Sequence, residues 1–326
     1  MKKIYFFTTI IIQIAVLCGC QKQMITTREN NTLSSNYSKY LKVENDKIVF
    51  KDYNSFQELM SILNSDKKTK LDNWVKYIGF DNSMLLAERD SNYIPPTTIE
   101  DPIMKAIVNK NGVFVIGEKI YKIMKDTVYT ILDGNYETLT KIENGNLSNI
   151  DNVSKFYTEN RIANSKIFSG QSEFYMYLLN GSFIKSSSSN IYDGNKYVND
   201  RVRISAWSRN FGLYSSNGIQ EEYQNKTKNI WGNVTWKAGN QIDHGIINGT
   251  TEGRYASLLE PWLPFYVSGS DEEYLVTRVD KTLFYQAIQG TTIETNYING
   301  AYQFNIYKVE NGITKYYFGS IVYSWQ

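Results

Sequence analysis

Cys20 is the residue of this chain whose surroundings most clearly specify a chemistry. It ends the quartet Leu-Cys-Gly-Cys, which follows two N-terminal lysines and an apolar run over residues 4–17. A positive start, a hydrophobic stretch and small residues at a cleavage point are typical of a secretory signal peptide. We therefore predict a signal peptide over residues 1–19.

The same quartet resembles the lipobox of bacterial lipoproteins. That resemblance implies cleavage before Cys20 and acylation of its sulfur and its new amine, so lipid attachment is predicted at Cys20. A transmembrane anchor is disfavoured, because Thr8, Thr9 and Gln13 interrupt the run, which is shorter than the ~20 apolar residues of a span. The polar residues 20–36 then form a lipidated, flexible tether. The expected location is the cell envelope, at the outer membrane, on either its periplasmic or its surface face.

Other chemistry-bearing residues are scarce. Cys18 and Cys20 are the only cysteines, so a mature chain has no disulfide, no cysteine nucleophile and no thiolate metal site. His244 is the only histidine, which excludes multi-histidine zinc sites and leaves any Ser/His/Asp mechanism dependent on one ring. No nucleophile motif accompanies His244, so a structural role is favoured.

The charge balance excludes one class of partner. The precursor has 35 basic and 33 acidic residues, and cleavage removes Lys2 and Lys3, so the two signs become equal. A neutral mature chain has no global electrostatic signature of nucleic-acid binding. Membrane attachment would then depend on the lipid rather than on a basic patch.

Motifs of known chemistry are weak or missing. No phosphate-binding loop, dinucleotide fingerprint, HExxH or EF-hand spacing occurs, so no cofactor is predicted. The pairs Ser65–Lys68 and Ser182–Lys185 match Ser-x-x-Lys, but the companion elements of serine acyl-enzymes are missing. The acidic cluster over residues 271–273 is expected in a solvated Gly-Ser loop, with a weak Ca²⁺ site as the alternative. No catalytic residue or metal ligand is assigned.

Aromatic residues are the one compositional excess. They make up 14% of the chain, with 26 tyrosines and six tryptophans. Flat rings on strands could stack against sugars, although half-buried strands are rich in Tyr and Trp in any case. The candidates for glycan binding are Trp207, Trp231, Trp236 and Trp262.

The elements that must position these residues change character along the chain. Residues 37–145 are predicted to form an α+β domain, with helices near Ser55, which is expected to begin a capping box, near Trp74, and after Asp101 at an N-cap. A β-hairpin follows over residues 117–132, around a Lys-Asp turn. Residues 146–164, which are polar, are predicted to be a linker.

Residues 165–326 are predicted to form an antiparallel β domain that resembles a sandwich. Seven Asn-Gly pairs occur after residue 110, and we expect them to mark hairpin turns between about ten short strands. The last strand, over residues 313–325, has large residues on both faces and is expected to be central. The predicted fold class is thus α+β, with a small helix-plus-hairpin part before an antiparallel β-sandwich-like domain.

Two longer stretches resemble segments of uncharacterised lipoproteins from Bacteroides-type bacteria. They are Asn109–Ile123 (NKNGVFVIGEKIYKI) and Arg203–Gly218 (RISAWSRNFGLYSSNG), the second followed by Glu222-Tyr223 and Ile230-Trp231. The strand-to-helix segment over residues 48–56 belongs to the same resemblance. The resemblance implies an exported, lipid-anchored α+β protein, and the family has no activity that could be assigned to a residue here.

The sequence therefore favours a lipid-anchored envelope protein that binds a glycan or a protein partner through its β domain. Two alternatives stay open. One is a carboxylate-dependent glycoside hydrolase, whose two acidic groups sequence cannot place at the required separation. The other is a structural component of an adhesion or fimbrial assembly, which an unpaired edge strand would favour.

Overall fold

The computed structural model describes residues 37–65, 70–90, 93–97, 99–148, 150–158, 170–228, 231–239, 242–257, 261–310 and 312–326. The predicted signal peptide, the tether and Cys20 lie outside the described residues and stay predictions.

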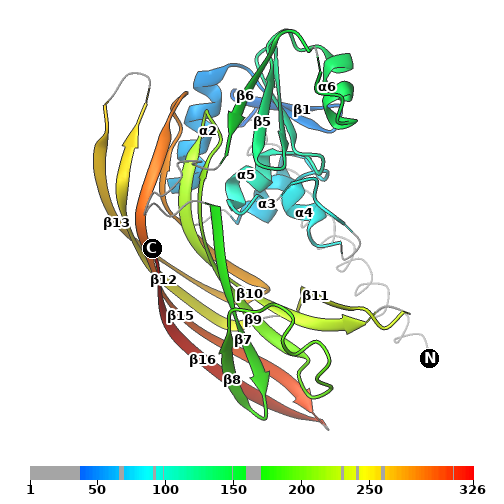
Figure 1. Ribbon diagram of the computed structural model, residues 1–326, viewed down its shortest axis with the longest axis vertical. Helices are drawn as coiled ribbons and strands as arrows, with labels where there is room; N and C mark the ends of the chain where they lie inside the picture. Colours follow the sequence, from blue (N-terminus) through cyan, green and yellow to red (C-terminus); the bar gives the residue numbers. More distant parts are fainter. Residues whose placement is uncertain are drawn as a thin grey trace, which may run out of the picture.

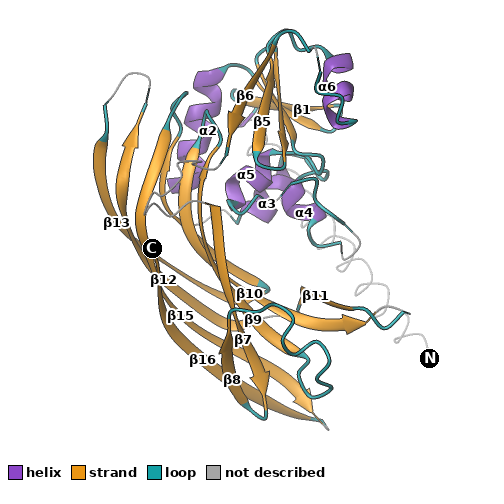
Figure 2. Cartoon of the chain, viewed as in Figure 1, coloured by secondary structure: helices purple, strands orange, loops and turns teal. Residues whose placement is uncertain are grey.

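Most of the described chain is β-structure, with several antiparallel sheets and few helices (Figures 1 and 2). The helices are α2 (Tyr53–Ser65), α3 (Leu71–Tyr77), α4 (Met84–Ala87), α5 (Pro102–Ile107) and α6 (Tyr136–Glu143). The N-terminal strands are β1 (Leu41–Glu44), β2 (Lys47–Phe50), β3 (Val113–Ile116), β4 (Lys119–Met124), β5 (Thr127–Ile131) and β6 (Val153–Tyr157). The C-terminal strands are β7 (Gly170–Leu179), β8 (Ser182–Ser186), β9 (Asp200–Asn210), β10 (Ser215–Lys228), β11 (Val234–Ala238), β12 (Ile242–Ala256), β13 (Leu263–Val276), β14 (Arg278–Gln286), β15 (Thr292–Glu310) and β16 (Ile313–Trp325).

The N-terminal sheet has the order β1-β2-β3-β4-β5-β6. Its neighbours are antiparallel except β2 and β3, whose connection carries helices α2 to α5. Asn45 and Asp46 take positive φ angles of 48° and 58° in the β1–β2 turn, and Lys125 takes 55° in the β4–β5 turn. The hairpin predicted over residues 117–132 is therefore present as β4 and β5.

Helix α2 begins earlier than the sequence pattern indicated. The predicted capping residue, Ser55, lies inside the helix, and its backbone N–H donates to the Asp52 carboxylate over 2.7 Å. Asp52 therefore supplies the acceptor that the free N–H groups of the first turn need. The predicted start was wrong because aspartate and serine are both good N-cap residues. The Ser-x-x-Glu spacing matches a capping box at Ser55, whereas the cap is Asp52, three residues earlier.

Helix α5 has the predicted start. Asp101 accepts hydrogen bonds from the N–H groups of Ile103 and Met104, both at 2.8 Å, and Pro102 occupies the first turn. Helices α4 and α6 were not foreseen: the first is a single turn capped by Ser83, and the second is an eight-residue helix capped by Asn135.

Strand β6 lies within residues 146–164, for which the sequence predicts a linker. It pairs with β5 over five residue pairs, from Ile131↔Val153 to Thr127↔Tyr157, and completes the N-terminal sheet. Its side chains are mostly exposed, with a V-S-K-F-Y sequence that gives only a weak alternating pattern. The polar composition indicated a linker because this edge strand has little surface to bury.

The C-terminal strands form two sheets that enclose one hydrophobic core. One sheet has the order β11-β10-β9-β7-β8, with β14 also pairing β10, and the other has the order β13-β12-β15-β16. Figure 1 shows these strands as long and curved. We call the shared cluster the inter-sheet core: it includes Phe174, Ile204 and Ile219 from the first sheet and Tyr302 and Phe304 from the second.

Three predicted Asn-Gly turns are wrong, because Gly218, Gly249 and Gly300 lie inside strands β10, β12 and β15. Gly249 is paired directly with Gly269 on one side and Gly300 on the other, so three glycines form a row across the sheet. A Cβ at Gly249 would lie 2.7 Å from Ile219 Cδ1. These glycines therefore make room for side chains of the inter-sheet core rather than for a turn.

The Asn180-Gly181 turn between β7 and β8 is present, with φ angles of 51° and 82°. The last strand, β16, is not central. It lies at an edge of its sheet, pairs with β15, and alternates between exposed and covered residues over much of its length. The acidic residues 271–273 belong to strand β13 and not to a loop.

The N-terminal part is held against the C-terminal sheets by buried polar contacts. Arg209 donates to both oxygens of Glu100, over 2.8 and 2.7 Å, and both side chains are almost fully buried. Tyr214 donates to the second oxygen of Asp101 over 3.0 Å. The same segment that starts α5 thus also attaches the helices to strand β9 and its turn.

Candidate binding site

The exposed side of the β13-β12-β15-β16 sheet, opposite the inter-sheet core, is the first candidate; we call it the outer face. Side chains alternate across a strand, so cross-strand partners share a face. The middle of this face carries mainly short hydroxyl and amide side chains without formal charge, together with the apolar Ile246, Ala301 and Val322 and one carboxylate, Glu272. The hydroxyl and amide side chains are Asn248 and Thr250 on β12, Ser268 and Ser270 on β13, Asn299 and Gln303 on β15, and Ser320 and Ser324 on β16.

Aromatic rings bound this polar middle at both ends. At one end Tyr266 is 67% exposed, and Trp262 is nearby in sequence and has the Arg254 guanidinium 4.7 Å from its ring centroid. At the other end Tyr274 is 58% exposed, and Phe318 belongs to the same cross-strand row through β12 and β15. The outer face is therefore mostly uncharged in its middle, with Glu272 as the one carboxylate next to the Tyr274 end, and aromatic at its ends.

The only histidine of the chain lies at the second aromatic end. The His244 ring stacks on Tyr274 with centroids 4.3 Å apart and planes 5° apart. Its Nε2 lies 2.8 Å from Glu272, which also accepts a 2.6 Å hydrogen bond from the Tyr274 hydroxyl. The Tyr274 hydrogen bond, and then His244, lower the pKa of Glu272. Two partners on one carboxylate fix the rings in place, which agrees with a structural role for His244.

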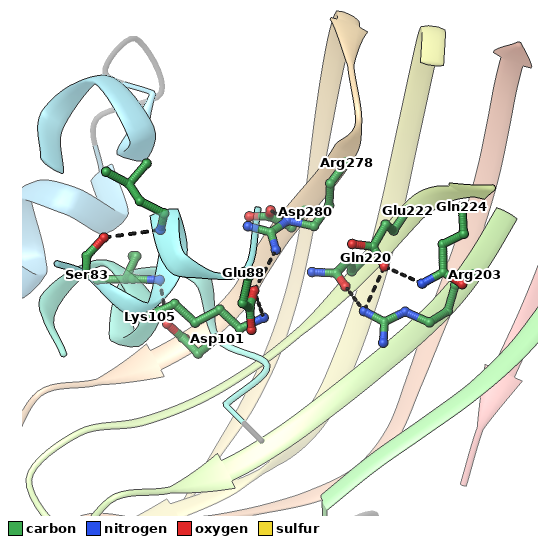
Figure 3. A network of polar contacts seen from close by, with 12 residues as sticks. Ser83, Glu88, Asp101, Lys105, Arg203, Gln220, Glu222, Gln224, Arg278 and Asp280 are labelled. Atoms are coloured by element: carbon green, nitrogen blue, oxygen red, sulfur yellow. Dashed lines mark hydrogen bonds and ion pairs between the residues drawn. The ribbon is translucent and has the colours of Figure 1, made fainter. Parts of the chain in front are cut away.

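The second candidate is a cleft of about 600 Å³ between helices α2 to α5 and strands β10, β13 and β14. Its lining includes Arg89 and Glu88 from the helical side and Glu222, Asp271 and Arg278 from the strands. Figure 3 shows the charged side chains that meet there.

Two groups of ion pairs lie at this cleft. Glu88 binds the Lys105 ammonium at 2.8 Å and the Arg278 guanidinium at 3.5 Å, and Glu222 binds Arg203 at 3.2 Å (Figure 3). Burial raises the pKa of Glu222, but Arg203, Arg278 and Lys105 outweigh burial and lower it. Glu222 is therefore held ionised.

Asp271 lines the same cleft with the opposite tendency. Burial raises the pKa of its carboxyl, and the hydrogen bond from the Glu272 N–H and then the charge of Lys281 oppose that rise only in part. Two carboxyl groups whose environments move their pKa values apart are a pattern of acid–base sites.

The four tryptophans named from the sequence do not form a row. Trp207 is fully buried, and Trp236 is half-buried with the Arg201 guanidinium 4.3 Å from its ring centroid. Trp231 is 81% exposed, just before strand β11, and Trp262 lies at one end of the outer face. Tyrosines supply most of the rings of that face, and the sequence signal that could have found them is the alternation Tyr-x-Ser-x-Ser-x-Glu-x-Tyr over residues 266–274.

The two Ser-x-x-Lys matches show no catalytic arrangement. Ser65 ends helix α2, and Lys68 lies outside the described residues. Ser182 begins strand β8, and the Lys185 ammonium lies 3.7 Å from the centroid of the Tyr323 ring. Within the described ranges, no three His, Cys, Asp or Glu side chains come together as a metal-binding group.

No helix among the described residues combines the length and apolarity that a bilayer span requires. No protein-family model matches the chain, and no curated protein is detectably similar to it. The resemblance to Bacteroides-type lipoproteins therefore stays a prediction, carried by the segments over residues 109–123 and 203–218.

Proposed function

We propose that this chain is an exported lipoprotein, anchored to the outer membrane through Cys20, whose sandwich-like C-terminal domain binds a neutral glycan on its outer face. The observation that carries the proposal is the composition of that face, in which uncharged hydroxyl and amide groups lie between two sets of exposed aromatic rings. The signal and lipobox pattern over residues 1–20 supports the anchoring.

The chemistry of the outer face matches that of a sugar chain. Hydroxyl and amide side chains both donate and accept hydrogen bonds, as sugar hydroxyls do. Aromatic rings offer large apolar faces of the kind that sugar rings can stack on. An anionic polymer or an acidic peptide would find no basic group in the middle of the face, so a neutral glycan is the better match.

The size of the face favours a chain over a single sugar. Tyr266 and Tyr274 are eight residues apart on strand β13, which at ~3.4 Å per residue separates them by about 27 Å. Both rings lie on the outer face. A ligand that contacts both ends must therefore be an extended oligosaccharide or polysaccharide.

The test uses the full chain in a non-ionic detergent and affinity electrophoresis through gels that contain neutral polysaccharides. At least one glucan, mannan or galactan is expected to retard the protein. The double variant Tyr266→Ala, Tyr274→Ala is expected to lose at least ten-fold in affinity, while Tyr197→Ala, an exposed tyrosine of the β8–β9 connection, binds unchanged. Retardation by none of these polymers, or equal retardation of all variants, would contradict the proposal.

A second candidate, carboxylate-dependent glycoside hydrolysis, is favoured by the opposite pKa shifts of Asp271 and Glu222 in the cleft. In that case Asp271 would be the proton donor and Glu222 the ionised partner. Release of reducing sugar by the wild-type chain, abolished in Asp271→Asn and in Glu222→Gln, would favour this candidate. Unchanged polysaccharide after prolonged incubation would count against it.

A further inference from the structure

Strand β16 has a long, regular backbone edge that faces away from β15 and is not paired with another described strand. It pairs with β15 over thirteen residue pairs without a register shift, and within the described strands no other strand pairs with it. The unpaired edge of a regular strand offers a row of backbone donors and acceptors to another strand.

Devices that normally prevent such pairing are rare along β16. The strand contains no proline and no bulge, and Lys315 is its one charged residue. Tyr316, Phe318 and Val322 are large apolar or aromatic side chains on the outer face, between 64% and 76% exposed. A long, regular and apolar edge of this kind is a site of strand addition.

We infer that β16 pairs antiparallel with β16 of a second copy of this chain, with the two-fold axis between the two Ser320 residues. In that register Phe318 of one copy lies opposite Val322 of the other, and this contact occurs twice. Tyr316 likewise lies opposite Ser324. The two Phe318–Val322 contacts thus pair apolar side chains on either side of Ser320, whose side chain is small.

Electrostatics also permits this partner. Lys315 of each copy lies opposite Trp325 of the other, and the two Lys315 residues are about 34 Å apart along the strands, at ~3.4 Å per residue. No like charges therefore face each other, which a strand with several lysines or glutamates would not allow.

The sheet that contains β8 contacts β16 on its inner side, so the outer side of this edge is accessible to another chain. Lys185 of β8 lies on the Tyr323 ring, on the inner side of β16, whereas Phe318 and Val322 point to the outer side. Pairing of two copies would join their outer faces into one surface of eight strands. The inference does not depend on the ligand of that surface, because it rests on the backbone edge and its register.

The scarcity of thiols makes the register directly testable. The reference protein is the full chain with Cys18→Ser and Cys20→Ser, extracted in non-ionic detergent, so that an introduced cysteine is the only thiol. Directly opposed residues of antiparallel strands have Cα atoms about 4.5–5.5 Å apart, which suits a disulfide. We expect Ser320→Cys to form a disulfide-linked dimer on mild oxidation, at least ten-fold faster than Ser324→Cys or Ser268→Cys.

A mixture of the Phe318→Cys and Val322→Cys proteins is expected to form the mixed disulfide in preference to either homodimer. Val322→Lys, added to Ser320→Cys, places like charges near the axis and should reduce cross-linking at least ten-fold. Val309→Lys, at an exposed valine of β15, should leave it unchanged. Cross-linking of Ser324→Cys at the rate of Ser320→Cys, persistence of the dimer in Val322→Lys, or a wholly monomeric Ser320→Cys protein would overturn the inference.

Discussion

Two neighbouring glutamates on strand β10 lie in opposite environments on the two sides of one sheet. Glu222 lies on the side of the sheet that faces the helices, which we call the domain-facing side. Its carboxylate binds Arg203 and accepts a 2.8 Å hydrogen bond from Gln224. Glu221 lies in the inter-sheet core, is fully buried, and has no hydrogen-bond partner for either oxygen among the described residues. Burial alone would raise the pKa of Glu222, but the neighbouring cations Arg203, Arg278 and Lys105 lower it below its ordinary value. Burial raises the pKa of Glu221 well above its ordinary value, and no cation of the described chain opposes that rise.

The comparison teaches that the two sides of this sheet are stabilised differently. The domain-facing side depends on charged groups that satisfy one another, and the loss of one partner leaves the other buried and unpaired. The inter-sheet side depends on apolar packing, where a carboxyl group is tolerated only in its neutral form. Removal of a carboxyl group should therefore change stability in opposite directions on the two sides.

The largest effect is expected for Arg209→Met, on the domain-facing side. Removal of the guanidinium leaves Glu100 buried without its two charge-assisted hydrogen bonds, which should lower the free energy of unfolding by about 3–5 kcal/mol. Urea denaturation measures this change. The matched control is Lys42→Met, whose ion pair with Glu44 is exposed, and its effect should stay below about 1 kcal/mol. Equal effects of the two variants would remove the distinction between buried and exposed pairs.

The opposite sign is expected for Glu221→Leu, in the inter-sheet core. Replacing a buried carboxyl that has no partner by an apolar side chain should raise the free energy of unfolding at pH 8 by about 1–3 kcal/mol. Glu222→Leu on the next residue should lower it, because Arg203 then loses the nearer of its two carboxylate partners. A destabilised Glu221→Leu protein would show that the core needs this carboxyl.

Packing on the inter-sheet side can be probed at Gly249. A methyl group there would meet Ile219 Cδ1 and Leu283 Cδ1 at 2.7 and 2.9 Å. Both atoms end flexible side chains, so Gly249→Ala should destabilise at the lower end of about 1–3 kcal/mol. Gly194→Ala, where no atom lies within 4 Å, should be close to neutral. Thermal unfolding of the two variants measures the difference.

The smallest effects are expected in the pH dependence of stability. The unfolded state releases the Glu221 proton above about pH 4.5 while the folded state keeps it, so stability falls as pH rises from that value, by at most about 1.4 kcal/mol per unit. Glu222 acts in the opposite direction: its stabilisation is present above pH 4.5 and is lost as pH falls through its lowered folded pKa. Glu221→Gln should flatten the alkaline slope and Glu222→Gln the acid slope. Unfolding curves between pH 3 and 9 that lack these changes would contradict the assignment.

The sequence predicted local structure where residues next to each other in the chain determine it. The Asp101–Pro102 start of helix α5 and the Lys125 turn depend on neighbouring residues, and both are present. The β-rich character of the C-terminal part followed from alternating apolar residues, and ten strands, β7 to β16, lie in its described residues.

The sequence could not predict features that depend on partners far along the chain. Gly249 and Gly300 resemble turn glycines, and only the pairing of β12 with β13 and β15 shows that they form a row beneath the side chains of β10 and β14. Strand β16 has large residues on both faces, which is typical of a central strand. The sequence of the strand alone does not reveal whether one or two other strands pair with it. Glu221 and Glu222 are chemically identical, and the pleat alone assigns them to opposite sides.

The outer face was predictable only in part. Aromatic excess indicated stacking surfaces, and Trp262 does lie at one end of this face, but Trp207 is buried. Tyrosines supply most of the exposed rings of this face, because their hydroxyl groups hydrogen-bond to water while their rings lie on the strand surface. Their alignment depends on the register of four strands, which a single sequence does not reveal.

The glycine row has a consequence for chemical ageing. In flexible chains Asn-Gly is the dipeptide most prone to deamidation, because the glycine nitrogen attacks the asparagine side-chain carbonyl and expels ammonia. At Asn248-Gly249 and Asn299-Gly300 both residues are held in extended strands whose pairing opposes that attack. Loss of ammonia at these two sites would therefore record how long a molecule has spent unfolded, and each event would leave a permanent negative charge in the mostly uncharged middle of the outer face.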